Sequence, residues 1–176
     1  MTFADAIRSC LRKYVTFSGR ATRPEYWWFV LFIVVGGIVT GILDSTLFGE
    51  TIVESDGSRT AVGSDGPISS IFSLATLIPL LAAGWRRMHD TGRSGLYLLY
   101  PILVWIGIAS FASMIGATSS IMSGDFGSVF AGITGIILAI SVIFAVFSPF
   151  IVIWWLSRPT QTGPNDFGPN PNEVPA

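Results

Sequence analysis

Charged side chains are scarce in this sequence. They make up only 12% of its 176 residues, whereas 51% are hydrophobic and the mean hydropathy is +0.63. A soluble domain usually carries about 25% charged residues. So little charge leaves too little polar surface to coat a globule, which excludes an ordinary water-soluble domain.

Residues for disulfide and metal chemistry are almost missing. The only cysteine is Cys10, so an internal disulfide is excluded. The only histidine is His89, and the acidic residues are scattered along the chain. A zinc or iron site needs a cluster of such ligands. We therefore expect no metal and no cofactor.

Long uncharged runs dominate what remains. They cover residues 26–43, 66–85, 94–124 and 126–157. About 20 apolar residues cross the hydrocarbon core of a bilayer as a helix. The sequence therefore predicts an all-α, polytopic membrane protein of one domain, residues 1–176. Its four transmembrane helices are expected at about 26–47, 67–87, 95–117 and 129–157, followed by a tail at 158–176.

The basic residues lie almost entirely on one side of these spans. Only Arg59 falls in the loop between the first two spans, and the other nine lie before the first span, between the second and third, or after the fourth. Lysine and arginine favour the cytoplasmic side. The N-terminus and C-terminus are both expected in the cytoplasm. The acidic outer loop 48–65 is rich in glycine and serine, which predicts a flexible tether.

The segment 1–17 has a helical hydrophobic period. Its apolar residues recur at three- and four-residue spacing: Phe3, Ile7, Leu11, Tyr14 and Val15. This pattern predicts a short N-terminal amphipathic helix. Either the helix lies in the interface of the inner leaflet, or it packs against the other helices.

Local signals mark helix ends and kinks. Thr22 and Glu25 have the spacing of a capping box at the start of the first span. Pro79 and Pro149 fall inside spans two and four, where neighbouring helices can satisfy the carbonyls that a proline leaves free.

Three polar segments share the side that carries the basic residues. They are FSGRATRPEYWW at 17–28, RRMHDTGRSG at 86–95 and TGPNDFGPNP at 162–171. The first two supply a candidate face for ion pairs or lipid headgroups, made of Arg20, Arg23, Glu25, Arg86, Arg87, His89, Asp90 and Arg93. The third supplies candidate docking residues in the tail, Asn165, Asp166 and Asn170. The charges are either topology signals and helix caps, or a clasp among the three segments, or a binding surface for anionic lipid or a partner.

The phrases FSGRATRPEYWWFVLF, RRMHDTGRSGLYLL and GPNDFGPNP, in this order, resemble the bacterial family called domain of unknown function 805. The resemblance covers nearly the whole chain. One departure is Asp166, where a basic residue is expected in many relatives. The resemblance implies a small multi-pass protein of the bacterial inner membrane, and it implies no activity.

The sequence favours a non-enzymatic role. His89 and Asp90 are adjacent, but no sequence pattern supplies a nucleophile, a phosphate loop or a metalloprotease helix. Two alternatives remain: a subunit of a transport or export system, although the span interiors lack ionisable residues, and an enzyme acting on a lipid-linked phosphate. The expected partners are the bilayer, anionic lipids, and a second copy or another membrane protein, but no nucleic acid.

Small residues in the last span bear on the question of a second copy. Gly127, Ala131, Gly135 and Ala139 recur at every fourth position. Such a stripe suits close helix packing, either within one chain or between copies.

Overall fold

Four helices in the structure are long and apolar enough to cross a membrane. The computed structural model describes residues 1–49, 51–55, 58–62, 66–130 and 132–173. The four are α2 (Arg23–Phe48), α3 (Pro67–Asp90), the helical stretch Gly95–Met114 and α7 (Gly132–Ser157). The third combines η1 (Gly95–Leu99), a 3₁₀ turn, with α4 (Tyr100–Met114). The predicted four-span helical architecture is thereby confirmed.

Shorter elements connect the long helices. α1 (Phe3–Arg12) precedes α2, while α5 (Ala117–Met122) and α6 (Phe126–Val129) join α4 to α7. The loop between α2 and α3 contains β1 (Thr51–Ser55) and β2 (Ser58–Val62), which pair antiparallel. This hairpin differs from the predicted flexible tether, because backbone pairing here does not follow from a glycine- and serine-rich composition.

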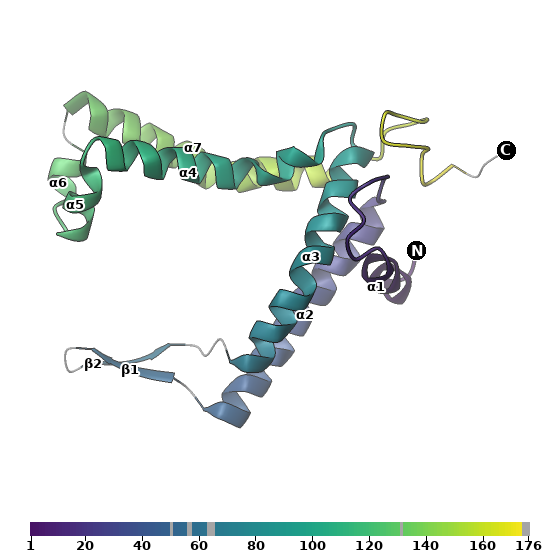
Figure 1. Cartoon of the computed structure of the whole chain (residues 1–176), viewed down its shortest axis with the longest axis horizontal. Helices are drawn as coiled ribbons and strands as arrows, with labels where there is room; N and C mark the ends of the chain where they lie inside the picture. Colours follow the sequence, from purple (N-terminus) through teal and green to yellow (C-terminus); the bar gives the residue numbers. More distant parts are fainter. Residues whose placement is uncertain (50, 56–57, 63–65, 131, 174–176) are drawn as a thin grey trace.

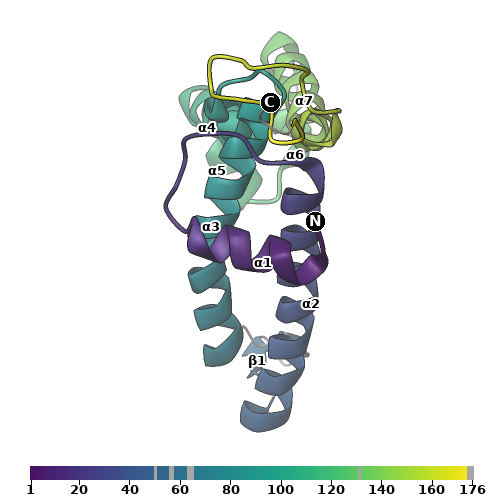
Figure 2. The same cartoon turned by 90° about the vertical axis from the view of Figure 1, so that its right-hand side faces the viewer.

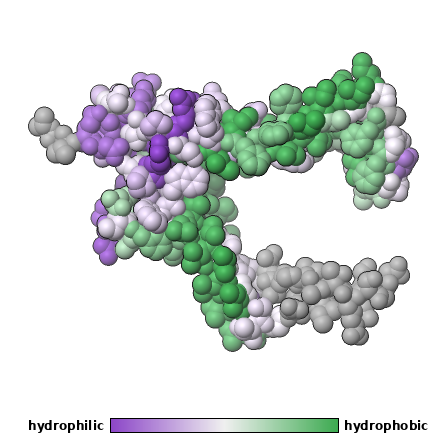
Figure 3. Space-filling view, turned by 180° about the vertical axis from the view of Figure 1, so that it is seen from behind, coloured by the Kyte–Doolittle hydropathy of each residue, from purple (hydrophilic) through white to green (hydrophobic). Residues whose placement is uncertain are grey.

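The long helices form two pairs that diverge from a common end. α2 lies beside α3, and α4 lies beside α7. The two pairs meet where α3 contacts α7, and they separate toward their other ends (Figure 1). The hydrophilic residues gather at the meeting end, and the surfaces of both arms are hydrophobic (Figure 3). Apolar side chains that face outward along both arms suit a lipid environment.

A small core joins the two pairs at the meeting end. Its buried members are Cys10, Tyr26, Phe29, Ala83, Met88, Val152 and Leu156. They come from α1, α2, α3 and α7, so this cluster holds together elements that are far apart in the sequence.

α1 packs across α2 and α3, as Figure 2 shows. Ala6 and Cys10 are fully buried in this contact, while Phe3 and Leu11 stay partly exposed along the same apolar side of the helix. Of the two alternatives left open by the sequence, the structure shows the packing of α1 against other helices.

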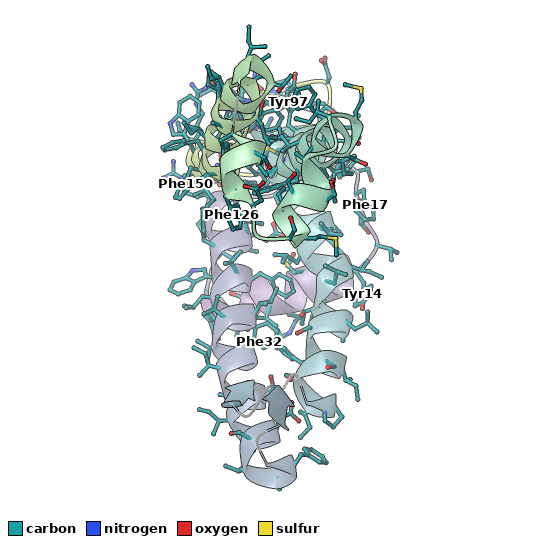
Figure 4. All side chains as sticks on the ribbon, turned by 90° about the vertical axis from the view of Figure 1, so that its left-hand side faces the viewer. Tyr14, Phe17, Phe32, Tyr97, Phe126 and Phe150 are labelled. Carbon is teal, nitrogen blue, oxygen red and sulfur yellow. The ribbon has the colours of Figure 1, made fainter. Side chains whose placement is uncertain are left out.

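Hydroxyl groups satisfy the carbonyls that the two internal prolines leave free. A proline at position i donates no hydrogen bond to the carbonyl at i−4. Tyr14 lies beside α3 (Figure 4). Its hydroxyl donates to the Ala75 carbonyl at 2.7 Å, four residues before Pro79. The Ser148 hydroxyl donates to the Ala145 carbonyl at 2.7 Å, four residues before Pro149.

Asp44 ties the end of α2 to the start of α3. Its carboxylate accepts hydrogen bonds from the backbone amides of Ile68 at 3.0 Å and Ser69 at 2.7 Å. The N-cap residue of α3 is Gly66, which has no side chain to cap the helix. A Cβ atom on Gly66 would lie 2.2 Å from Asp44 Cγ, so glycine is required for this approach.

Gly135, one of the small residues of α7, lies close to the backbone just before the helix. A Cβ atom on Gly135 would lie 2.3 Å from the backbone carbonyl carbon of Phe130. Ala131 lies outside the described residues.

Candidate functional site

The last turn of α3 carries four of the candidate residues into the interior. Arg86, Arg87, His89 and Asp90 are all buried. Cations near a helix C-terminus interact favourably with its dipole. The helix stops there because Gly92 takes a positive φ of 74°. The sequence thus concentrates ionisable groups where both helix pairs meet.

Asp90 is the centre of the first group of contacts. Its carboxylate accepts from Arg20 Nε at 2.9 Å and from Arg87 Nη1. It also accepts from the Thr160 hydroxyl at 2.7 Å. Asp90 therefore joins the segment before α2, the end of α3 and the segment after α7.

The remaining donors of Arg20 and Arg87 bind backbone carbonyls near the end of α7 and beyond it. Arg87 donates to Leu156 O at 2.9 Å and to Arg158 O. Arg20 donates to Gln161 O at 2.6 Å and to the carbonyl of Gly163 at 2.8 Å. The last carbonyls of a helix have no partner within it. Arg87 therefore caps α7, and Arg20 holds the chain that follows.

Glu25 and Arg86 form a second centre beside the first. Arg86 Nη1 donates to Glu25 Oε1 at 2.8 Å, and the Ser9 hydroxyl donates to the same oxygen at 3.0 Å. Lys13 Nζ lies 3.9 Å from this oxygen. The contacts link α1, α2 and α3. Arg86 Nε and Nη2 are buried and have no hydrogen-bond partner among the residues that the structure describes.

Thr22 caps α2, as predicted, but Glu25 does not complete the capping box. The Glu25 amide donates to the Thr22 hydroxyl at 3.3 Å. The Glu25 carboxylate instead turns toward Arg86, because a buried guanidinium needs a counter-charge.

Phe167 covers one face of the His89 imidazole, and one ring nitrogen lies within hydrogen-bond distance of a backbone carbonyl. Its Nδ1 lies 3.1 Å from the carbonyl oxygen of Gly19. The Phe167 ring stacks on the imidazole with centroids 3.9 Å apart and planes 7° from parallel. Asn165 Nδ2 donates to the His89 carbonyl at 2.9 Å. The tail therefore lies directly on the end of α3.

The other candidate residues occupy different environments. Asn170 is buried and donates to Glu173 at 2.7 Å, whereas Asp166 is exposed. Arg23 is also exposed. Arg93 is half-buried, with its guanidinium carbon 5.4 Å from the Trp155 ring centroid. Burial lowers the pKa of Arg93 from its ordinary value.

The site is a network of ion pairs and hydrogen bonds. Within the described residues no group of three or more His, Cys, Asp or Glu side chains could hold a metal ion. Burial raises the pKa of Cys10 to about 11, which keeps its thiol protonated and poorly nucleophilic.

Sequence reasoning missed three contributors to this network. They are Ser9, Thr160 and Phe167, which contact Glu25, Asp90 and His89. A lone hydroxyl or a phenylalanine in a hydrophobic chain gives no signal of such a contact. The one signal that could have found Phe167 is its position within the Gly-Pro-Asn segment.

A family model described as "Protein of unknown function (DUF805)" matches residues 14–169 of this chain. The chain belongs to the DUF805 family. This confirms the resemblance expected from the three sequence phrases. The DUF805 match includes every side chain around Asp90, but it leaves out Ser9 of the second centre.

Two curated relatives come from Escherichia coli strain K12. Inner membrane protein YhaI is 35% identical over 127 residues, which cover 68% of this chain and 95% of the relative. Inner membrane protein YhaH is 36% identical over 109 residues, which cover 60% of this chain and 82% of the relative. No solved structure matches the chain. The four helices and these DUF805 relatives identify a multi-pass membrane protein of an uncharacterised family.

Proposed function

We propose that this chain is a non-enzymatic scaffold of a bacterial inner membrane, with both termini in the cytoplasm. A buried ion-pair network locks the helix ends together, and exposed arginines around it bind anionic lipid headgroups. The observation that carries this proposal is the full engagement of Asp90 by Arg20, Arg87 and Thr160.

The network favours a structural role because its charged groups pair with one another and donate hydrogen bonds to backbone carbonyls. Asp90 and Arg87 have no exposed side-chain surface, and the Arg20 side chain is 1% exposed. A buried charge is tolerated when it is paired and hydrogen-bonded. A carboxylate that already holds two guanidinium groups is a poor general base, because proton abstraction needs access to a substrate.

The histidine supports the same conclusion. His89 Nδ1 lies beside a backbone carbonyl, and Phe167 covers one face of the ring. A lipid-linked phosphate would have to displace the tail before it reached this imidazole. The enzymatic alternative therefore finds less support in the geometry.

Two arginines beside tryptophans, the exposed Arg158 and the half-buried Arg93, support headgroup binding. The Arg158 guanidinium carbon lies 5.2 Å from the Trp154 ring centroid, and Arg93 lies over Trp155. Tryptophan is enriched at the headgroup level of membranes. Basic residues near an anionic leaflet contribute about 1 kcal/mol each. Nine of the ten basic residues fall on this side of the spans, which supports its cytoplasmic placement.

Lipid retention tests the proposal. The purified chain is placed in nanodiscs of phosphatidylcholine and phosphatidylglycerol, and the lipid that remains after extraction is analysed by mass spectrometry. We expect phosphatidylglycerol to be enriched, and the enrichment to fall in a variant that combines Arg93→Gln with Arg158→Gln. Arg59→Gln, which changes the one basic residue of the loop between α2 and α3, is the matched control.

Two results would contradict the proposal. One is equal retention of both lipids by the unchanged chain. The other is ion flux through liposomes that contain only this chain, which would support the transport alternative. Reporter fusions at residue 173 separately test whether the tail lies in the cytoplasm.

A further inference from the structure

We propose that one anionic glycerophospholipid binds in a discrete hollow on α2, here called the α2 hollow. It is lined by Arg23, Pro24, Trp27, Trp28 and Leu31. This site rests on the proposed function, because it requires the basic end of the protein to lie at a phospholipid surface. It goes further in assigning one lipid molecule to named residues.

The order of charged and apolar residues in the α2 hollow suits the headgroup end of a phospholipid. Its volume is about 330 Å³, and its lining residues lie on one face of the first turns of α2. Residues three, four and seven positions apart share a helix face. The one charged residue, Arg23, lies at the start of the helix, and apolar side chains continue along it. This order places a phosphate at the charged end and acyl chains beside Trp28 and Leu31.

The aromatic walls of the α2 hollow are held in place by other rings. Trp28 meets Phe3 of α1 edge to face, with centroids 5.8 Å apart and planes at 81°. Trp27 meets Tyr26 edge to face, with ring centroids 5.3 Å apart and planes at 76°. Side chains that are fixed before binding lose less conformational entropy when a ligand arrives. The hollow is therefore preorganised from two sides.

Arg23 differs from the arginines of the buried network. Arg20, Arg86 and Arg87 are buried and paired with Asp90 or Glu25. Arg23 is exposed, and it forms no hydrogen bond or ion pair with the other residues that the structure describes. Its guanidinium is therefore available to hold a phosphate through two parallel hydrogen bonds.

The apolar lining selects a lipid over a soluble phosphate compound. Four of the five lining residues are Pro, Trp or Leu, and the hollow opens on a helix with the length and hydropathy of a membrane span. A soluble phosphate compound would leave these side chains without an apolar partner. Acyl chains bury them, and the hydrophobic contribution grows with the area that is covered.

Native mass spectrometry of the full chain tests the inference. The protein is released from nanodiscs that contain equal amounts of phosphatidylglycerol and phosphatidylcholine, and the number and mass of retained lipids are measured. We expect one phosphatidylglycerol to persist on the unchanged chain. Arg23→Gln should lower its retention relative to phosphatidylcholine about fivefold, the factor expected for one basic residue at an anionic surface.

Two further variants separate the site from the general basic surface. Trp28→Ala removes one wall and should lower retention of the single lipid, while Arg8→Gln removes an exposed charge of the same end outside the α2 hollow and should not. Thermal unfolding followed by tryptophan fluorescence checks that each variant is folded.

The outcomes distinguish the site from the function on which it rests. If Arg23→Gln and Trp28→Ala both retain the single phosphatidylglycerol as well as the unchanged chain does, the α2 hollow is not its binding site. If phosphatidylglycerol enrichment is nevertheless lost in the variant that combines Arg93→Gln with Arg158→Gln, the proposed function stands. An equal loss in Arg8→Gln also overturns the discrete site. Absence of any phosphatidylglycerol preference in the unchanged chain overturns both.

Discussion

Replacing Asp90 with asparagine should strongly destabilise the protein. The Asp90 side chain is fully buried and accepts from Arg20, Arg87 and Thr160. Asparagine has nearly the same volume, but it is uncharged and its amide group is a donor. Two guanidinium groups would then lack their counter-charge. Removing one partner of a buried ion pair costs about 3–5 kcal/mol, because the remaining charge stays buried without compensation.

Reversible unfolding in mixed micelles measures this cost. The SDS fraction at the midpoint is followed by tryptophan fluorescence, and the free energies of unfolding are compared. Asp166→Asn removes an exposed carboxylate from the same tail and should change the free energy by no more than about 0.5 kcal/mol, as is usual for surface substitutions. A loss below about 1 kcal/mol for Asp90→Asn would refute the reasoning, since the pairing would then add little to stability.

Three further predictions concern contacts away from Asp90. Asp44→Ala should speed hydrogen exchange at the first amides of α3, since its carboxylate accepts from two of them; unchanged exchange would show that the amides are satisfied otherwise. Ser148→Ala should cost about 1–3 kcal/mol of unfolding free energy, because it leaves a buried proline-freed carbonyl unpaired. Tyr14→Phe, which removes an exposed hydrogen bond, should cost about 0.5–1.5 kcal/mol; a neutral effect of both would contradict this. Cys10 should resist a thiolate-directed alkylating reagent at pH 8 until the protein unfolds, since burial raises its pKa to about 11. The contribution of the protonated thiol to the free energy of unfolding is complete below its unfolded pKa near 9, and it is lost as pH rises through 11. Rapid labelling of Cys10 in the folded chain would contradict the prediction, because it would show that the thiol is accessible.

The sequence predicted the spans well and their arrangement poorly. Four uncharged runs were enough to anticipate four membrane-length helices, because the thickness of the hydrocarbon core sets their length. Helices such as α4 and α7 are apolar on all sides, so hydropathy does not indicate which face packs against which neighbour. The divergence of the two pairs therefore came only from the structure.

The sequence did not separate the candidate arginines by burial. The sequence grouped five arginines into one face: Arg20, Arg23, Arg86, Arg87 and Arg93. The structure buries Arg20, Arg86 and Arg87 and leaves Arg23 exposed. Spacing along the chain does not reveal this difference, because it depends on the long-range approach of Asp90 to the segment after α7.

The contacts of Thr160, Gln161 and Gly163 have a consequence for biosynthesis. These residues leave the ribosome after all four long helices, yet they supply partners to Arg20 and Asp90. Both helical hairpins must therefore enter the bilayer before their junction can close. A chain stalled before residue 160 would keep the ion pairs of Asp90 with Arg20 and Arg87, but it would lack the hydroxyl and carbonyl partners that the later residues supply.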